Sequence, residues 1–61
     1  MIELIGIERG TKLRIVGGIT AEVLESLNDE WVRVRLLEVP EGKGTAGGEE
    51  LCHATDVLEI V

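Results

Sequence analysis

Aromatic side chains are scarce in this sequence of 61 residues. Trp31 is the single tryptophan, and tyrosine and phenylalanine are absent. A groove for proline-rich helices is lined by several aromatic rings, and a methyl-lysine site is an aromatic cage. One indole can build neither of these sites. The composition therefore argues against both kinds of peptide reader.

Cysteine and long apolar runs are equally scarce. One Cys cannot form an intramolecular disulfide, and one Cys with one His is too few for a structural zinc. No apolar run approaches the ~20 residues of a membrane span. The start, Met1 to Leu4, lacks the basic and apolar regions of a signal peptide. We therefore expect no disulfide, no metal, no membrane partner and a cytoplasmic location.

The charge is strongly acidic. Twelve acidic and six basic residues give a net charge of −6, which argues against non-specific binding to nucleic acid. A hydrophobic fraction of 44% lies above the range of disordered chains. A chain of this length forms at most one domain, residues 1–61, whose core is built from aliphatic side chains.

Glycine divides the chain into short segments in which apolar and polar residues alternate, as they do in strands. The predicted strands are Thr11–Val16, Ile19–Leu27, Glu30–Val39, Glu49–His53 and Val57–Val61, with Ile2–Ile7, inside an N-terminal arm of residues 1–10, as a sixth candidate. Residues 40–48 have no apolar period and are predicted to be a flexible glycine-rich loop. Ala54–Asp56 is a candidate 3₁₀ turn. A helix over Ala21–Leu27 is the alternative that residue propensity leaves open.

Tight turns separate the predicted strands. Gly17-Gly18 and Asn28-Asp29 are both residue pairs that tolerate positive φ in hairpins. Five or six short strands in this length predict an all-β fold, an antiparallel meander curled into a small barrel. The alternation predicts a core of Leu13, Ile15, Ile19, Ala21, Val23, Val32, Val34, Leu36, Leu51, Val57 and Ile60.

The order of these elements resembles the SH3-like small barrels, the class that includes Tudor and KOW modules. The resemblance lies in two stretches, Gly18–Leu36 and Glu50–Ile60. The stretch Glu50–Ile60 is similar to the strand, one-turn 3₁₀ helix and final strand that close such barrels. The resemblance covers about residues 11–61, and it implies a five- to six-stranded barrel of the same connectivity. The aromatic row of the peptide-binding members is missing.

One face of the predicted meander is the candidate binding surface. The alternation places four of the six basic residues on this outward face, while most acidic residues fall in turns and near the termini. Trp and Arg are enriched at binding hot spots. The alternative is structural: opposite charges paired across strands, with Trp31 covering one end of the barrel. The candidate binding residues are Lys12, Arg14, Leu24, Trp31, Arg33, Arg35 and Leu37.

Two short motifs contain residue types found in metal, nucleophile or phosphate sites, but their spacing does not fit such sites. Cys52 and His53 are adjacent in a predicted strand, so they point to opposite faces and cannot share a metal or form a nucleophile pair. Cys52 is expected to be a small buried residue, and His53 to be exposed or to cap the turn. Gly42–Thr45 lacks the spacing and the helix of a phosphate-binding loop. We expect no catalytic residue, no cofactor and no enzymatic activity.

Aliphatic side chains outnumber the places in one small core. The surplus predicts burial between subunits or against a partner, so we expect a protein interaction or assembly module that forms a homo-oligomer. Two alternatives remain open. One is an RNA- or DNA-contacting module that uses Lys12, Arg14, Arg33 and Arg35. The other is an oligomer that binds a small ligand or an oxyanion. The surplus residues are Ile2, Leu4, Ile5, Ile7, Leu24, Leu37, Val39, Leu58 and Val61.

Overall fold

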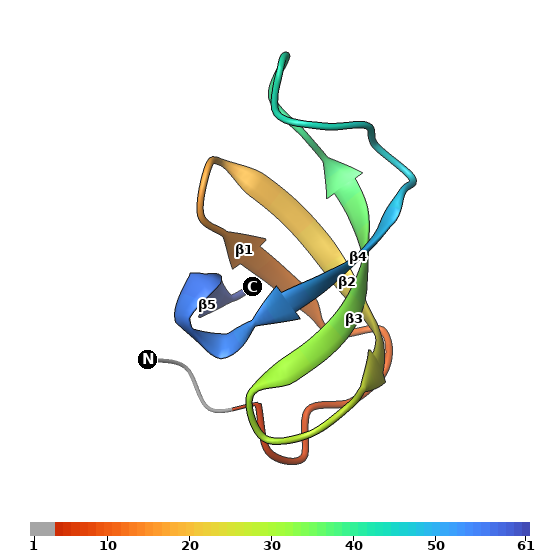
Figure 1. Cartoon of the computed structure of the whole chain (residues 1–61), viewed down its shortest axis with the longest axis vertical. Helices are drawn as coiled ribbons and strands as arrows, with labels where there is room; N and C mark the ends of the chain where they lie inside the picture. The colour runs from red at the N-terminus through yellow and green to blue at the C-terminus, as the bar shows by residue number, and fades with distance from the viewer. Residues whose placement is uncertain (1–3) are drawn as a thin grey trace.

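The computed structural model describes residues 4–61 and confirms an all-β fold (Figure 1). The described part of the chain contains five strands and one helical element, η1, which is a single turn of 3₁₀ helix. In chain order these elements are β1 (Lys12–Ile15), β2 (Ile19–Ser26), β3 (Trp31–Glu38), β4 (Glu49–His53), η1 (Ala54–Asp56) and β5 (Val57–Ile60). Almost all of the remaining described residues lie in turns or loops.

The five strands form one antiparallel sheet in the order β4-β3-β2-β1-β5. β4 and β5 are therefore opposite edges of the sheet, yet the three residues of η1 join them directly. So short a connection requires the sheet to curl until its two edges approach each other (Figure 1). The curled sheet differs from the predicted barrel in one respect, because β4 and β5 do not pair and the sheet stays open.

The turns of the two hairpins, β1–β2 and β2–β3, have different conformations. Gly17 and Gly18 have φ of 92° and 77°, as the predicted tight turn requires. The positive φ predicted for Asn28-Asp29 is wrong, because no non-glycine residue of the described chain has positive φ. The loop is longer than two residues, and the side-chain oxygen of Asn28 accepts the backbone N–H groups of Glu30 and Trp31 at 2.8 and 3.0 Å.

The core lies on the concave side of the sheet. Burial alternates along β1, along β3 from Val32 to Leu36 and at Ala21 and Val23 of β2, and no side-chain N or O atom is left buried without a partner among the described residues. The strand interpretation of Ala21–Leu27 therefore holds over the helix alternative. The buried residues are Leu4, Leu13, Ile15, Ala21, Val23, Val32, Val34, Leu36, Cys52, Ala54 and Val57, with Ile7, Ile19 and Val39 packed against them.

Two predicted core residues are wrong, and both lie on the edge strands. Leu51 is 60% exposed because Cys52, opposite Val32, takes the inward position in β4. Ile60 is 52% exposed because no further strand covers it beyond β5, although it lies opposite Leu13. Leu4, expected among the surplus, is instead fully buried in the core.

Two glycine-containing segments, residues 4–10 and residues 40–48, contain no strand. Residues 4–10 contain turns and no strand, so the described part of the predicted strand Ile2–Ile7 is wrong, and its first two residues lie outside the described chain. Leu4 still packs into the core from this irregular segment. Residues 40–48 form the predicted loop between β3 and β4, which extends beyond the sheet at the top of Figure 1.

Candidate functional site

The convex, outer face of the sheet brings together the predicted basic residues, but in alternation with acids. One row runs across four strands, pairing Lys12 with Glu22, Glu22 with Arg35 and Arg35 with Glu49. Opposite charges in neighbouring positions attract, and each such pair stabilises a sheet by roughly 0.2–1 kcal/mol. Glu49 begins β4, as predicted, and lies within this row.

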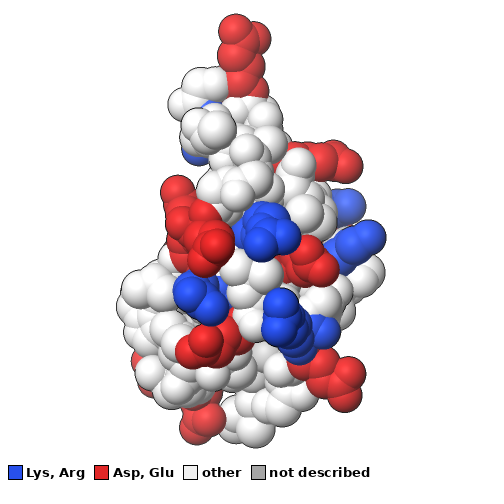
Figure 2. Space-filling view, turned by 90° about the vertical axis from the view of Figure 1, so that its right-hand side faces the viewer, with Lys and Arg blue, Asp and Glu red and all other residues white. Residues whose placement is uncertain are grey.

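Ion pairs engage two of the three arginines of this face. Arg14 pairs with Glu59 of β5. The Arg33 guanidinium lies 3.3 Å from Glu25 and 3.6 Å from Glu49. Figure 2 shows the result on one side of the molecule, where basic and acidic groups lie side by side. The outer face is therefore a mixed-charge surface rather than a continuous basic patch.

Trp31 lies at one end of this face, beside His53. The two residues are opposite each other in the β3–β4 pairing, and their rings meet edge to face with centroids 4.7 Å apart. Such aromatic pairs add about 0.5–1.5 kcal/mol beyond the burial of area. Trp31 remains 39% exposed. The indole therefore packs against the His53 ring and still exposes part of its own surface to solvent.

His53 caps η1, as expected for a residue at the turn. Its Nδ1 accepts the Thr55 backbone N–H at 3.1 Å, so the proton of the neutral ring lies on Nε2. Nε2 then donates to a Glu30 carboxylate oxygen at 3.3 Å. The backbone N–H of Ala54 also donates to the Glu30 carbonyl at 2.8 Å. These bonds join η1 to the loop before β3, and they explain His53 without a metal or catalytic role.

The two leucines among the predicted binding residues lie at irregularities of the sheet. Leu24 and Leu37 are the extra residues at the two register shifts between β2 and β3. Both side chains are half-buried. The sequence pattern assumes that side chains alternate without interruption, and the two bulges interrupt that alternation at Leu24 and Leu37. Neither leucine therefore continues the row of outward-facing residues.

The two edges of the sheet have different side chains. β5 is apolar and exposed: Leu58 is 56%, Ile60 52% and the following Val61 56% exposed. Its one charge, Glu59, is paired with Arg14. β4 instead begins with the exposed Glu49 and Glu50. Two surplus residues, Leu58 and Val61, were predicted from the sequence, whereas Ile60 was missed because alternation alone does not reveal which strand ends the sheet.

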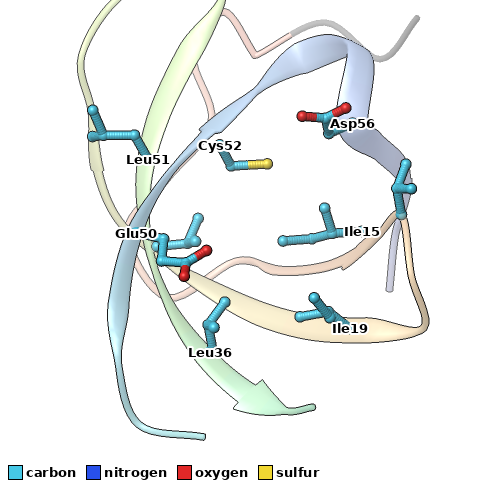
Figure 3. A pocket seen from close by; sticks show the side chains of 9 residues that line it. Ile15, Ile19, Leu36, Glu50, Leu51, Cys52 and Asp56 are labelled. Atoms are coloured by element: carbon cyan, nitrogen blue, oxygen red, sulfur yellow. The ribbon is translucent and has the colours of Figure 1, made fainter. Parts of the chain in front are cut away.

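A cavity of about 270 Å³ opens on the inner side of the sheet (Figure 3). Apolar side chains of β1, β2 and β3 line its floor, and the carboxylates of Glu50 and Asp56 lie on opposite sides of it. None of the candidate binding residues lines it. Alternation with the buried Cys52 could have indicated that Glu50 faces inward, but the position of Asp56 depends on η1. The apolar lining residues are Ile15, Val16, Ile19, Val34, Leu36 and Leu51.

Cys52 is buried in the wall of this cavity. Burial, together with the negative charges of Asp56 and Glu50, raises the pKa of its thiol from 9.0 to about 11. The thiol is therefore protonated and unreactive at neutral pH. Its sulfur lies 3.6 Å from the His53 carbonyl oxygen, to which it donates.

Residues 4–61 contain no group of three or more His, Cys, Asp or Glu side chains that could hold a metal ion, and no helix long and apolar enough to cross a membrane. No family model matches the sequence, and no curated protein or solved structure matches it.

Proposed function

We propose that the protein is a small non-enzymatic assembly module that self-associates through β5. The observation that carries this proposal is the apolar edge: Leu58, Ile60 and Val61 are each more than half exposed on a strand with a neighbour on one side only. An exposed apolar edge strand is a template for pairing with another strand. The partner is a second copy of the chain, whose β5 aligns antiparallel to the first.

Charge supports a second copy as the partner. Arg14 neutralises Glu59 in each copy, so two β5 strands meet without an unpaired like charge. A contact between two β4 strands would bring together two copies of Glu50, which forms no ion pair in the described chain, beside Glu49, which pairs with Arg33. The described β5 has four residues, so the interface is small and we expect a dissociation constant of roughly 10–100 µM.

Sedimentation velocity over a range of concentrations tests this proposal with a matched pair of variants. Ile60→Lys introduces a charge at the β5 edge and should weaken self-association at least ten-fold. Leu51→Lys is the control, because Leu51 is equally apolar and 60% exposed on the opposite edge. A wild-type chain that stays monomeric at 500 µM contradicts the proposal, and so does equal weakening by both variants.

The remaining alternatives have less support. Contact with RNA or DNA through Lys12, Arg14, Arg33 and Arg35 would compete with the ion pairs of Arg14 and Arg33. An oxyanion in the cavity would face two carboxylates. The SH3-like relationship stays a proposal, supported by the order of β2, β3, β4, η1 and β5. A cytoplasmic location is likewise proposed, since the free Cys52 suits a reducing compartment.

A further inference from the structure

The cavity on the inner side of the sheet combines an apolar floor with two carboxylates. Its lining comes from β1 to β4, the turn after β1, and η1, so it is separate from the exposed edge of β5. Its volume of about 270 Å³ lies below the roughly 300–1,000 Å³ of sites for drug-sized ligands. An occupant must therefore be small, and part of its surface must be apolar.

The two carboxylates approach the cavity from different elements. Glu50 projects from β4 and Asp56 from η1, and Figure 3 shows them on opposite sides of the floor formed by Ile15, Ile19 and Leu36. Neither forms an ion pair with any residue of the described chain. The outer-face acids Glu25, Glu49 and Glu59 differ, because each is paired with an arginine.

The thiol of Cys52 lies in the wall of the same cavity, and its pKa is raised. This thiol lies between these carboxylates in Figure 3. Burial is the largest cause of its raised pKa, and the negative charges of Asp56 and Glu50 add to it. A charge distribution that disfavours a thiolate favours a cation in the same place. The lining contains no Lys or Arg that could supply one.

We propose that this cavity binds a short linear alkyl diammonium ion. Its methylene groups lie on the apolar floor, and each ammonium group pairs with one of the two carboxylates, Glu50 and Asp56. A diammonium ion fits better than a monoammonium ion because two carboxylates flank the floor from opposite sides. Both carboxylates are exposed at the rim, so binding is weak, with a dissociation constant of roughly 1–10 mM.

The test is a titration of the full chain, at matched ionic strength, followed by NMR shifts of the amides around the cavity. The probes are 1,4-diaminobutane, butylamine and 1,4-butanediol, all near neutral pH so that the amines are charged. We expect the diamine to bind about three-fold to five-fold more tightly than butylamine, and butylamine more tightly than the diol. Equal affinity for the diamine and the diol overturns the proposal.

Three variants separate this site from general attraction to an acidic protein. Glu50→Gln and Asp56→Asn should each abolish the advantage of the diamine over butylamine, and agreement between them guards against a folding defect in one. Glu49→Gln is the matched control on the outer face and should leave the advantage unchanged. Loss of the advantage in Glu49→Gln overturns the proposal, as do shifts of equal size and location with magnesium chloride.

A lysine side chain offers one ammonium group on the same kind of apolar chain. Titration with N-acetyl-lysine-N-methylamide distinguishes this source. Binding no tighter than that of butylamine supports a free diammonium ion, whereas binding tighter than that of the diamine overturns it in favour of a peptide. The outcome is independent of self-association, because the Ile60→Lys variant retains every residue of the cavity.

Discussion

The two edge strands of the sheet share a fold environment and differ in their side chains. Each pairs with one neighbour, β4 with β3 and β5 with β1. β4 carries two consecutive glutamates, of which Glu49 pairs with Arg33 and Glu50 has no ion-pair partner in the described chain, whereas the single acid of β5 is paired with Arg14. Charged side chains protect an edge strand from pairing with other chains. The difference teaches that two edges of one sheet can carry opposite kinds of side chain, one acidic and one apolar.

The inner side of β4 is acidic as well, because the Glu50 carboxylate faces the cavity beside Cys52. With a pKa of about 11 in place of 9.0, the Cys52 thiolate fraction at pH 8 is about 100-fold lower than that of an ordinary thiol. Alkylation with iodoacetamide should be slower by at least this factor. Glu50→Gln should accelerate it several-fold, and Glu49→Gln should not. A rate equal to that of a small-molecule thiol contradicts the buried position of Cys52.

The same thiol predicts the pH dependence of stability. Its contribution is fully present well below pH 9, where the thiol is protonated in both states, and is lost as the pH rises through 11, because the unfolded chain ionises first. The loss is about 2 kcal/mol at pH 10.5 and up to about 3 kcal/mol at higher pH. Urea denaturation of the wild type and Cys52→Ala at pH 8 and pH 10.5 measures it. Equal losses in the two proteins would assign the pH dependence to other groups.

The attachment of β5 to the sheet depends on its inward residue. Val57 is 4% exposed and lies opposite Ile15, so Val57→Ala should lower the free energy of unfolding by about 2 kcal/mol. The matched control is Leu58→Ala, one residue further and 56% exposed, which should change it by less than about 0.5 kcal/mol. Thermal denaturation compares the two. A larger loss in Leu58→Ala would mean that β5 is attached through its outer side chains.

Removing the two glutamates of β4 should make the two edges of the sheet alike in lacking unpaired charge. With threonine at positions 49 and 50, E49T and E50T together, β4 becomes a neutral strand with the exposed Leu51. We expect about three-fold stronger self-association, since a second edge can then pair. The increase should persist when Ile60→Lys blocks β5. Unchanged association would show that charge does not protect β4.

The smallest expected effect concerns the ion pair that joins β1 to β5. Both partners are about half exposed, at 54% and 50%, and water screens their attraction. Arg14→Ala should therefore cost less than about 1 kcal/mol of stability. It also frees Glu59 at the edge, so dimerisation should weaken two-fold to three-fold at low salt and recover in 0.5 M NaCl. Weakening that is independent of salt would contradict a role of charge at this edge.

Alternation in the sequence was sufficient to predict the strands in the centre of the sheet and their inward residues. Leu13, Val23, Val32 and Val34 are buried as predicted, because strands with neighbours on both sides bury one full face. The errors occur at the edges and irregular segments. Ile60 alternates correctly but has no strand beyond it, and Leu4 reaches the core from a segment without alternation.

The candidate site was predicted in part for the same reason. Arg33 and Arg35 point outward as the pattern indicates, but the glutamates opposite them depend on the register between strands, which one strand's sequence does not contain. Leu24 and Leu37 depart from the outer row because two bulges interrupt that register. The cavity needs residues from four strands and η1, so no single stretch of sequence predicts it.

Hydrogen exchange at two protein concentrations tests the assembly claim most directly, because both edges are measured in one molecule. The Val61 N–H donates to Lys12 of β1, so alternation turns the Ile60 N–H towards the open edge. Between 10 µM and 1 mM, protection of the Ile60 amide should rise about four-fold to seven-fold, while the amides of β4 keep their exchange rates. Constant exchange at Ile60, or an equal gain in β4, would contradict assembly through β5.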